Sequence, residues 1–284
     1  MDKISMTDFS IEHPALELGK KSAYENHYNP DKLFPILRDE KRLEIGISPD
    51  ALPFYGYDLW NHYEVSWLNP KGKPMVAIAE IIYSCHSPSI IESKSMKLYF
   101  NTFNQTRFQD KKEVEQTIQK DLEAALQHPV CIQLFNLEEA SYLNQIQAFK
   151  GIHLDNLDVD CDEYQPNAQL LKIGAEEVEE TLYSNLLKSN CLVTFQPDWG
   201  SIQIHYIGQK IQHASLLQYF ITFRNHNEFH EQCIERIFQD IMQQCKPKSL
   251  TVYGRYTRRG GVDINPIRST EKNIEIKKIR LIRQ

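Results

Sequence analysis

The sequence lacks long apolar segments and has few cysteines. No stretch approaches the roughly 20 uninterrupted apolar residues of a membrane helix, and the N-terminus has neither the basic nor the apolar region of a signal peptide. The six cysteines include no C-x-x-C pair and occur at positions 85, 131, 161, 191, 233 and 245. A chain of 284 residues does not need disulfides, so we expect reduced thiols, a cytoplasmic location and no association with membranes.

Positive charge is also in deficit. The chain carries 32 basic and 38 acidic side chains, for a formal net charge of −6, so direct binding to nucleic acid is not expected. Hydrophobic residues make up 41% and charged residues 25%, which is usual for globular proteins. The length is about twice that of the commonest domain and favours two domains or one large one.

The first half reads as a turn-rich lead-in, then strands, then a helix. Residues 1–52 are polar and form the lead-in, and β-forming residues on both sides of 69–74 predict a hairpin. Residues 96–103 are predicted as a further strand. The run 114–127 is predicted as a helix because apolar residues recur every four positions, at Val114, Ile118, Leu122 and Leu126.

The second half repeats this order. Residues 191–196 and 201–209 are predicted as strands around a turn at 197–200, and 216–223 as a third strand. A helix with an apolar stripe is predicted over 228–245. The last predicted element is a hairpin over 251–264.

A short repeat supports a duplication. The pattern Y-F-x-T-F occurs at 99–103 and again at 219–223, 120 positions later, with Ser95 and Ser215 in step. We predict one module over 1–140, including the lead-in, an acidic connector over 141–177 and a second module over 178–284. Antiparallel sheets with helices packed on one face place the chain in the α+β class.

The segment 91–99, IESKSMKLY, matches the motif E-[SL]-K-[SA]-x-K-[LYFW]. This motif and four further segments resemble the nitrile reductases of queuosine synthesis, the NADPH-dependent 7-cyano-7-deazaguanine reductases, in their long two-module form. The four segments are 56–69, 189–200, 229–231 and 256–266. The resemblance implies tandem tunnelling-fold modules, a homodimer, and reduction of 7-cyano-7-deazaguanine to 7-aminomethyl-7-deazaguanine with two NADPH.

The resemblance also implies the catalytic residues. A nitrile carbon is a weak electrophile, and a cysteine thiolate that adds to it forms a thioimide that can accept hydride. Cys191 is the implied nucleophile and Asp198 the implied acid, whose pKa burial would have to raise. His230 is the implied proton relay or substrate contact. No metal is expected in this mechanism.

Binding residues follow from the same motifs. Glu92 and Glu231 are the carboxylates implied to accept the paired N–H donors of the deazaguanine edge. The remaining implied substrate contacts are Ile91, Ser93, Phe229 and His230. The sequence has no G-x-G-x-x-G at a strand–helix junction, and the implied NADPH contacts are Ser93, Lys94, Arg259 and Gly260.

Taken without the resemblance, the residues leave other interpretations open. Cys191 could be a buried structural thiol, Asp198 a β-turn residue, Phe229 a core residue, and the glutamates solvated charges. A GTP cyclohydrolase or pterin enzyme of the same fold would need zinc, yet His226 and His230 form the only i, i+4 histidine pair. A non-catalytic purine-binding module would not explain Cys191 together with Asp198.

Overall fold

The computed structural model describes residues 25–143, 145–274 and 279–284. Over these residues, nine strands form one sheet in the order β5-β3-β2-β11-β10-β9-β7-β6, with β8 paired to β9. All pairs are antiparallel except β6 with β7. The strands are β2 (Tyr55–Leu68), β3 (Pro74–Ser84), β5 (Val130–Phe135), β6 (Ile152–His153), β7 (Ile173–Ser184), β8 (Lys188–Asn190), β9 (Pro197–Ile211), β10 (Ser249–Tyr256) and β11 (Val262–Ser269).

Helices and a small second sheet complete the described fold. The small sheet pairs β1 (Pro35–Leu37) with β4 (Ser89–Ile91). The α-helices are α1 (Asp39–Glu44), α2 (Ser93–Asn101), α3 (Lys111–Leu126), α4 (Leu137–Leu143), α5 (His213–Thr222) and α6 (His230–Cys245). Three short 3-10 helices are η1 (Pro30–Lys32), η2 (Ala168–Leu170) and η3 (Phe223–Asn225).

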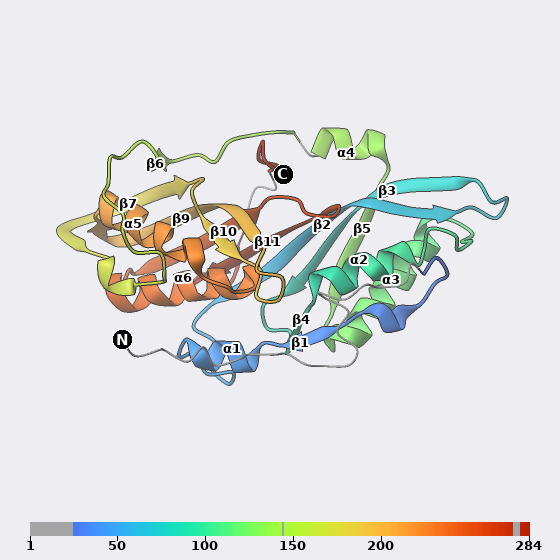
Figure 1. The fold of residues 1–284 in the computed structure, drawn as a ribbon, viewed down its shortest axis with the longest axis horizontal. Coiled ribbons are helices and arrows are strands. Elements are labelled where there is room, and N and C mark those ends of the chain that lie inside the picture. Colours follow the sequence, from blue (N-terminus) through green and yellow to red (C-terminus); the bar gives the residue numbers. More distant parts are fainter. Residues whose placement is uncertain (1–24, 144, 275–278) are drawn as a thin grey trace, which may run out of the picture.

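Two apolar cores hold the helices to the sheet. Side chains of α2 and α3 pack with β2, β3 and β5, and side chains of α5 and α6 pack with β7, β9 and β10. Strand β11 pairs with β2 and sends Val262 and Ile264 into the first core. The two halves therefore share one continuous sheet (Figure 1), and the predicted α+β class, with antiparallel strands and helices packed against the sheet, is confirmed.

The strongly periodic elements are where the sequence predicts them. The hairpin turn between β2 and β3 is closed by the side-chain oxygen of Asn69, which accepts hydrogen bonds from the backbone N–H groups of Lys71 and Lys73. Helices α3 and α6 occupy the predicted 114–127 and 228–245 to within a few residues, and β10 and β11 form the predicted last hairpin.

Two predicted strands are helices. Residues 96–103 lie mostly in α2, and 216–223 mostly in α5. Both segments are rich in β-forming residues, but the buried side chains of α2 include Met96, Tyr99 and Phe100, which are spaced i, i+3, i+4. Helical spacing of the apolar face therefore outweighs local β propensity.

The predicted turn at 197–200 is also wrong. Residues 197–200 are the start of β9, where Asp198 pairs with Ser189 of β8. The predicted strand 191–196 is instead a loop, closed by a hydrogen bond from the Cys191 N–H to the Gln196 carbonyl at 2.9 Å. This places Asp198 on a strand and Cys191 in the adjoining loop.

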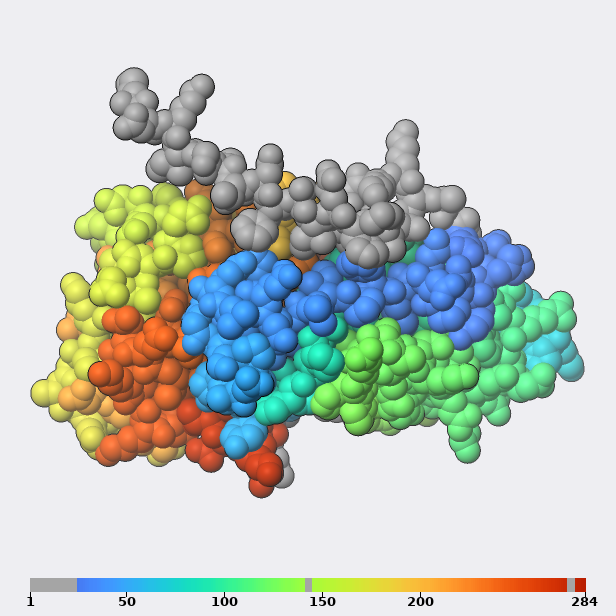
Figure 2. All heavy atoms as spheres, turned by 90° about the horizontal axis from the view of Figure 1, so that it is seen from below, coloured from blue at the N-terminus to red at the C-terminus, as the bar shows by residue number. Residues whose placement is uncertain are grey.

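The predicted module boundaries cut through elements. Helix α4 spans the predicted limit at 140, and β7 begins at Ile173, inside the predicted connector. The division into two modules itself stays a prediction. Of the predicted lead-in, residues 1–24 lie outside the described residues, and the rest carries η1, β1 and α1. Figure 2 shows the described part of the lead-in, residues 25–52 in blue, lying across both the first half, in green, and the second half, in orange.

No helix in the described part of the chain is long and apolar enough to cross a membrane.

Candidate active site

A cavity of about 300 Å³ opens where the two halves meet. This volume is at the lower end of the range for small-molecule sites. The first half contributes Ile90, Ile91, Ser93, Lys94 and Lys97; the second contributes Cys191, Thr194, Gln196, Asp198, Phe229, His230, Glu231, Thr257, Arg259, Val262 and Ile264. All the sequence-predicted site residues line it except Glu92 and Gly260.

Cys191 is held in the loop between β8 and β9. The Phe195 N–H donates to the Cys191 carbonyl at 3.0 Å, and Phe195 adopts a positive φ of 57°. The preceding residue, Asn190, exchanges backbone hydrogen bonds with His226 and Glu228, at 2.8 and 3.0 Å. Since residues 226–228 lead directly into α6, the cysteine loop and the start of α6 are tied together, and the half-buried Cys191 faces the cavity.

Asp198 is buried and paired with two basic side chains. One carboxylate oxygen contacts the Arg259 guanidinium, and the other lies 3.3 Å from Nε2 of His230. Burial by itself raises the pKa of Asp198, but His230 and Arg259 outweigh it, and the pKa is held below its usual value. The prediction that burial raises the pKa of Asp198 is therefore wrong: with His230 and Arg259 beside it, Asp198 is an ionised carboxylate near neutral pH.

His230 begins α6 and has a fixed orientation. Its ring stacks on Tyr256 with the ring centroids 3.9 Å apart and the planes 13° apart. Nε2 points to Asp198. The imidazole is thus held between a strand residue of β10 and the carboxylate, in a position to pass protons between Asp198 and the cavity.

Glu231 is a buried carboxylate facing the cavity. Only 2% of the residue is exposed, and Oε1 has no hydrogen-bond partner among the described residues. Burial and the negative charge of Asp58 raise the pKa of Glu231 to about 7. His230 and Arg38 act in the opposite direction but do not outweigh these causes. A buried acceptor without a partner is costly, so this oxygen is suited to a ligand with N–H donors.

Glu92 has a structural role that the sequence reasoning did not include. It is the N-cap of α2, and its two carboxylate oxygens accept the backbone N–H groups of Lys94 and Ser95, each at 2.7 Å. The side chain is buried and is not part of the cavity wall. Burial raises the pKa of Glu92, against the effect of the two backbone hydrogen bonds. Binding of substrate by Glu92 stays a prediction, and it would require these bonds to open.

Basic side chains line one side of the cavity. Lys94 and Lys97, one turn apart on α2, line it together with Arg259, whose guanidinium also donates to Oε1 of Gln196 at 2.5 Å. Burial and the charge of Arg259 lower the pKa of Lys97, against the opposing charges of Glu92, Asp198 and Cys191. Gly260 has a positive φ of 56°, and a Cβ there would lie 3.1 Å from Cδ of Lys97.

Several lining residues were missed by the sequence reasoning. Lys97 lies within the matched motif, and its i, i+3 spacing from Lys94 was the available signal. Gln196, Thr194 and Thr257 lie in the segments 189–200 and 256–266 that carry the family resemblance, but no local pattern singles them out, and the cysteine loop and the turn after β10 bring them to the cavity. The described residues contain no group of three or more His, Cys, Asp or Glu side chains that could hold a metal ion.

Comparison with known proteins identifies the family. Residues 24–134 match a family model described as nitrile reductase, 7-cyano-7-deazaguanine-reductase N-term. Residues 197–275 match a second family model, described as QueF-like protein. The chain belongs to the 7-cyano-7-deazaguanine reductase family.

Curated relatives of this family cover nearly the whole chain. An NADPH-dependent 7-cyano-7-deazaguanine reductase of Legionella pneumophila is 61% identical over 269 residues, 94% of each chain. Proteins of the same name from Azoarcus sp. and Dechloromonas aromatica are each 52% identical, covering 95% and 99% of this chain and 96% and 100% of their own. A solved archaeosine synthase structure covers 36% of this chain and 99% of its own at 12% identity, and its TM-score of 0.30 adds nothing to the fold assignment.

Proposed function

We propose that this protein is a nitrile reductase that converts 7-cyano-7-deazaguanine to 7-aminomethyl-7-deazaguanine with two NADPH, in queuosine biosynthesis. The observation that carries the proposal is one cavity that holds a thiol, Cys191, an ionised carboxylate, Asp198, and a buried carboxylate with an unpartnered oxygen, Glu231. The names of the relatives, which cover nearly the whole chain, support the same activity and cofactor.

Recognition of the heterocycle is assigned to the start of α6. The deazaguanine edge has an N–H and an NH₂ group side by side, and the Glu231 carboxylate can accept both. Water is excluded from this carboxylate, which strengthens those bonds. Phe229 can stack on the ring, and Ile91, Ser93 and His230 complete the walls. Glu92 supports this wall by capping the helix that carries Ser93.

Covalent addition to the nitrile is assigned to Cys191 and Asp198. The ionised Asp198 takes the proton from the Cys191 thiol, and the resulting thiolate adds to the nitrile carbon. The sulfur lone pair forms the new C–S bond, one π bond of the nitrile breaks, and its electron pair takes the proton from Asp198 at the nitrogen, which yields a thioimide. No other reactant is consumed in this step. His230, which contacts Asp198, can supply later protons to the nitrogen.

The basic wall has the donor set of a site for a phosphorylated cofactor. Lys97 is crowded by Arg259, and a bound anion would relieve that repulsion. Lys94, Arg259 and Ser93 would hold phosphate groups, and the absence of a side chain at Gly260 keeps that approach open beside Lys97. When bound there, NADPH supplies hydride, twice for each amine formed. Reduction would restore the Cys191 thiolate when sulfur leaves.

The test is formation of the covalent adduct without cofactor. Purified protein mixed with 7-cyano-7-deazaguanine is expected to gain the full mass of the nitrile by intact mass spectrometry, because addition has no leaving group. Cys191→Ala should gain nothing and should lack NADPH oxidation. Cys131→Ala, which removes an exposed thiol, is the matched control and should behave as the wild type. An adduct that persists in Cys191→Ala would refute the assignment of the nucleophile.

Three further expectations stay predictions. They are the homodimer, the cytoplasmic location and the lack of direct contact with nucleic acid.

A further inference from the structure

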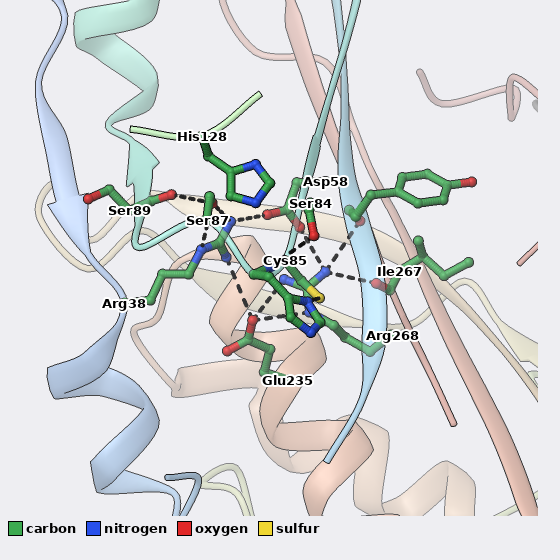
Figure 3. A network of polar contacts seen from close by, with 12 residues as sticks. Arg38, Asp58, Ser84, Cys85, Ser87, Ser89, His128, Glu235, Ile267 and Arg268 are labelled. Atoms are coloured by element: carbon green, nitrogen blue, oxygen red, sulfur yellow. Dashed lines mark hydrogen bonds and ion pairs between the residues drawn. The ribbon is translucent and has the colours of Figure 1, made fainter. Parts of the chain in front are cut away.

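A cluster of buried charges lies behind the cavity. Its members come from four elements and from the residue before α1, and each is at most 3% exposed. They are Arg38, Arg42 of α1, Asp58 of β2, Glu235 of α6 and Arg268 of β11. Figure 3 shows Arg38 and Arg268 directed toward Glu235 from different sides.

Ion pairs join the cluster into one network. Arg38 contacts Asp58 at 2.5 Å and Glu235 at 3.6 Å. Arg268 contacts the same two carboxylates, at 2.9 and 2.8 Å, and Arg42 contacts Glu235 at 2.7 Å. The guanidiniums of Arg38 and Arg268 thus each span from the sheet to α6, and the proposed chemistry uses none of these residues.

Arg38 is also bound to one wall of the cavity. Strand β1, which precedes it, pairs Pro35 with Ile91 and Ile36 with Ile90, and the Arg38 N–H donates to the Pro88 carbonyl at 3.0 Å. The Arg38 guanidinium donates to Oγ of Ser87, at 3.2 and 3.3 Å. Figure 3 shows Ser87 in turn hydrogen-bonded to the carbonyl of Ser89, the residue before the wall residues Ile90 and Ile91.

The other end of the Arg38 contact reaches the opposite wall. Glu235 lies four residues after Glu231 on α6, so the two side chains lie on the same side of the helix, one turn apart. Glu231 is the residue assigned above to the heterocycle. Arg38 therefore links the β4 wall to the helix that carries the recognition carboxylate.

We propose that Arg38 is a positioning residue, which sets the spacing between β4 and the first turn of α6 and thereby the affinity of the cavity for the flat heterocycle. This inference rests on the proposed function, since it names what fills the space between the two walls. Arg38 does not touch the reacting atoms and acts through Glu235 and Ser87.

Arg42 offers a matched comparison within the same cluster. It is equally buried and also binds Glu235, but its second hydrogen bond goes to the Cys85 carbonyl, at 2.7 Å, and not to the Ser87–Ser89 pair. If the cluster only stabilised the fold, substitutions of Arg38 and of Arg42 would have the same effect on substrate affinity. A positioning role restricted to Arg38 makes them differ in substrate affinity.

The experiment compares Arg38→Lys with Arg42→Lys. A lysine keeps the charge but cannot hold Ser87, Asp58 and Glu235 with one planar group. We expect Arg38→Lys to raise the KM for the nitrile about tenfold, with kcat and the KM for NADPH within twofold of wild type. Arg42→Lys should leave all three within twofold, although both variants should lower the Tm. Equal KM values for the two variants, with wild-type turnover intact, would overturn the inference but not the proposed function. Absence of turnover in the wild type would instead refute the proposed function.

A charge-removing variant adds a second readout. The titratable and charged groups that act on Glu231 include Asp58, His230, Arg38 and Tyr83. Arg38→Met removes the guanidinium, a cation that favours the ionised carboxylate. The acid limb of kcat/KM for the nitrile should move to higher pH in Arg38→Met, while Arg38→Lys keeps the wild-type profile. An unmoved limb in Arg38→Met would contradict the electrostatic part of the role. If Arg38→Met shows no cooperative thermal transition, the lysine pair decides the inference.

Discussion

Helices α3 and α6 occupy corresponding places in the two halves and begin in opposite ways. Each has 16 residues, a buried apolar stripe and a left-handed C-cap, Gln127 with φ 51° and Lys246 with φ 47°. At the start of α3, Asp110 accepts the Glu113 N–H at 2.9 Å, and Glu113 accepts the Gln109 N–H at 2.6 Å. This reciprocal pair is a variant of the capping box, in which Glu113 accepts the N–H of the residue before the N-cap Asp110.

The start of α6 has no such cap. Its N-cap is Phe229, which has no side-chain capping bond, and the first residues His230 and Glu231 face the cavity. The difference teaches that helix stability and ligand recognition compete for the same positions. At α6 the first residues are suited to a ring and its proton transfers, and no side chain caps the helix. The first residues of α2 also line the cavity, but that helix is capped by Glu92, which lies outside the cavity wall.

Two side-chain hydrogen bonds recur at corresponding positions in the two halves. Tyr99 donates to Asp121 and Tyr219 to Asp240, each at 2.6 Å. Oγ of Ser95 and of Ser215 each donate to the carbonyl of the N-cap residue three positions earlier, at 2.7 and 2.8 Å. These contacts are common to both halves, whereas the starts of α3 and α6 differ.

The largest expected effect is on the KM for the nitrile, which should depend on the start of α6 and not on the start of α3. Glu231→Gln should raise the KM for the nitrile at least 100-fold, because two hydrogen bonds to a charged group are weakened at about 1.5 to 3 kcal/mol each. Glu113→Gln in the α3 capping box should leave the KM unchanged. Steady-state kinetics measures both, and a KM for Glu231→Gln within fivefold of wild type would show that α6 does not carry recognition.

An intermediate effect concerns stability and pH. The pKa of Glu231 in the folded state, about 7, lies above its ordinary value, so its contribution to stability is present below about pH 4.5 and lost as pH rises toward 7. Ligand-free Glu231→Gln should therefore be more stable than wild type by about 1 to 3 kcal/mol at pH 8, and the difference should vanish near pH 4.5.

Denaturant unfolding at the two pH values measures this difference. Glu92→Gln is the comparison, because its carboxylate caps α2 with both oxygens, and an amide can accept only one of those bonds. It should lower stability at pH 8. A destabilised Glu231→Gln at pH 8 would mean that an interaction stabilises the charged form of Glu231.

The smallest effect tests the capped helix. Asp110→Ala should lower the free energy of unfolding by about 1 kcal/mol, the usual value of an N-cap, with kcat and both KM values unchanged. Unfolding in denaturant and a kinetic assay measure the two outcomes. A change in the KM for the nitrile would contradict the distinction between α3 and α6, because α3 would then influence a cavity that it does not line.

Predictability from the sequence followed the strength of the local pattern. Helices α3 and α6 could be predicted because their apolar residues repeat at helical spacing, and the β2–β3 hairpin because its turn is rich in Asn, Pro and Gly. Helices α2 and α5 were mistaken for strands since Tyr, Phe and Thr favour strands in isolation. Packing against the sheet decided in favour of the helix.

In the site, too, some features could be predicted from local sequence motifs and others depend on tertiary contacts. Cys191, Asp198, His230 and Glu231 were selected through motif resemblance, and the structure brings all four to one cavity. The pKa of Asp198 was mispredicted because it depends on His230 and on Arg259, and Arg259 is 61 positions away in the chain. The role of Glu92 depends on where α2 begins, which a misassigned strand had hidden.

The sequence by itself determined the family, the α+β class and the residue types needed for addition to a nitrile, since these are written in short motifs and local periodicity. Only the tertiary structure decided which carboxylate is left without a partner, which is ionised, and that Arg38 joins the two cavity walls. Protonation and partnership depend on burial and on charges brought together from distant positions, and no local pattern encodes those distances.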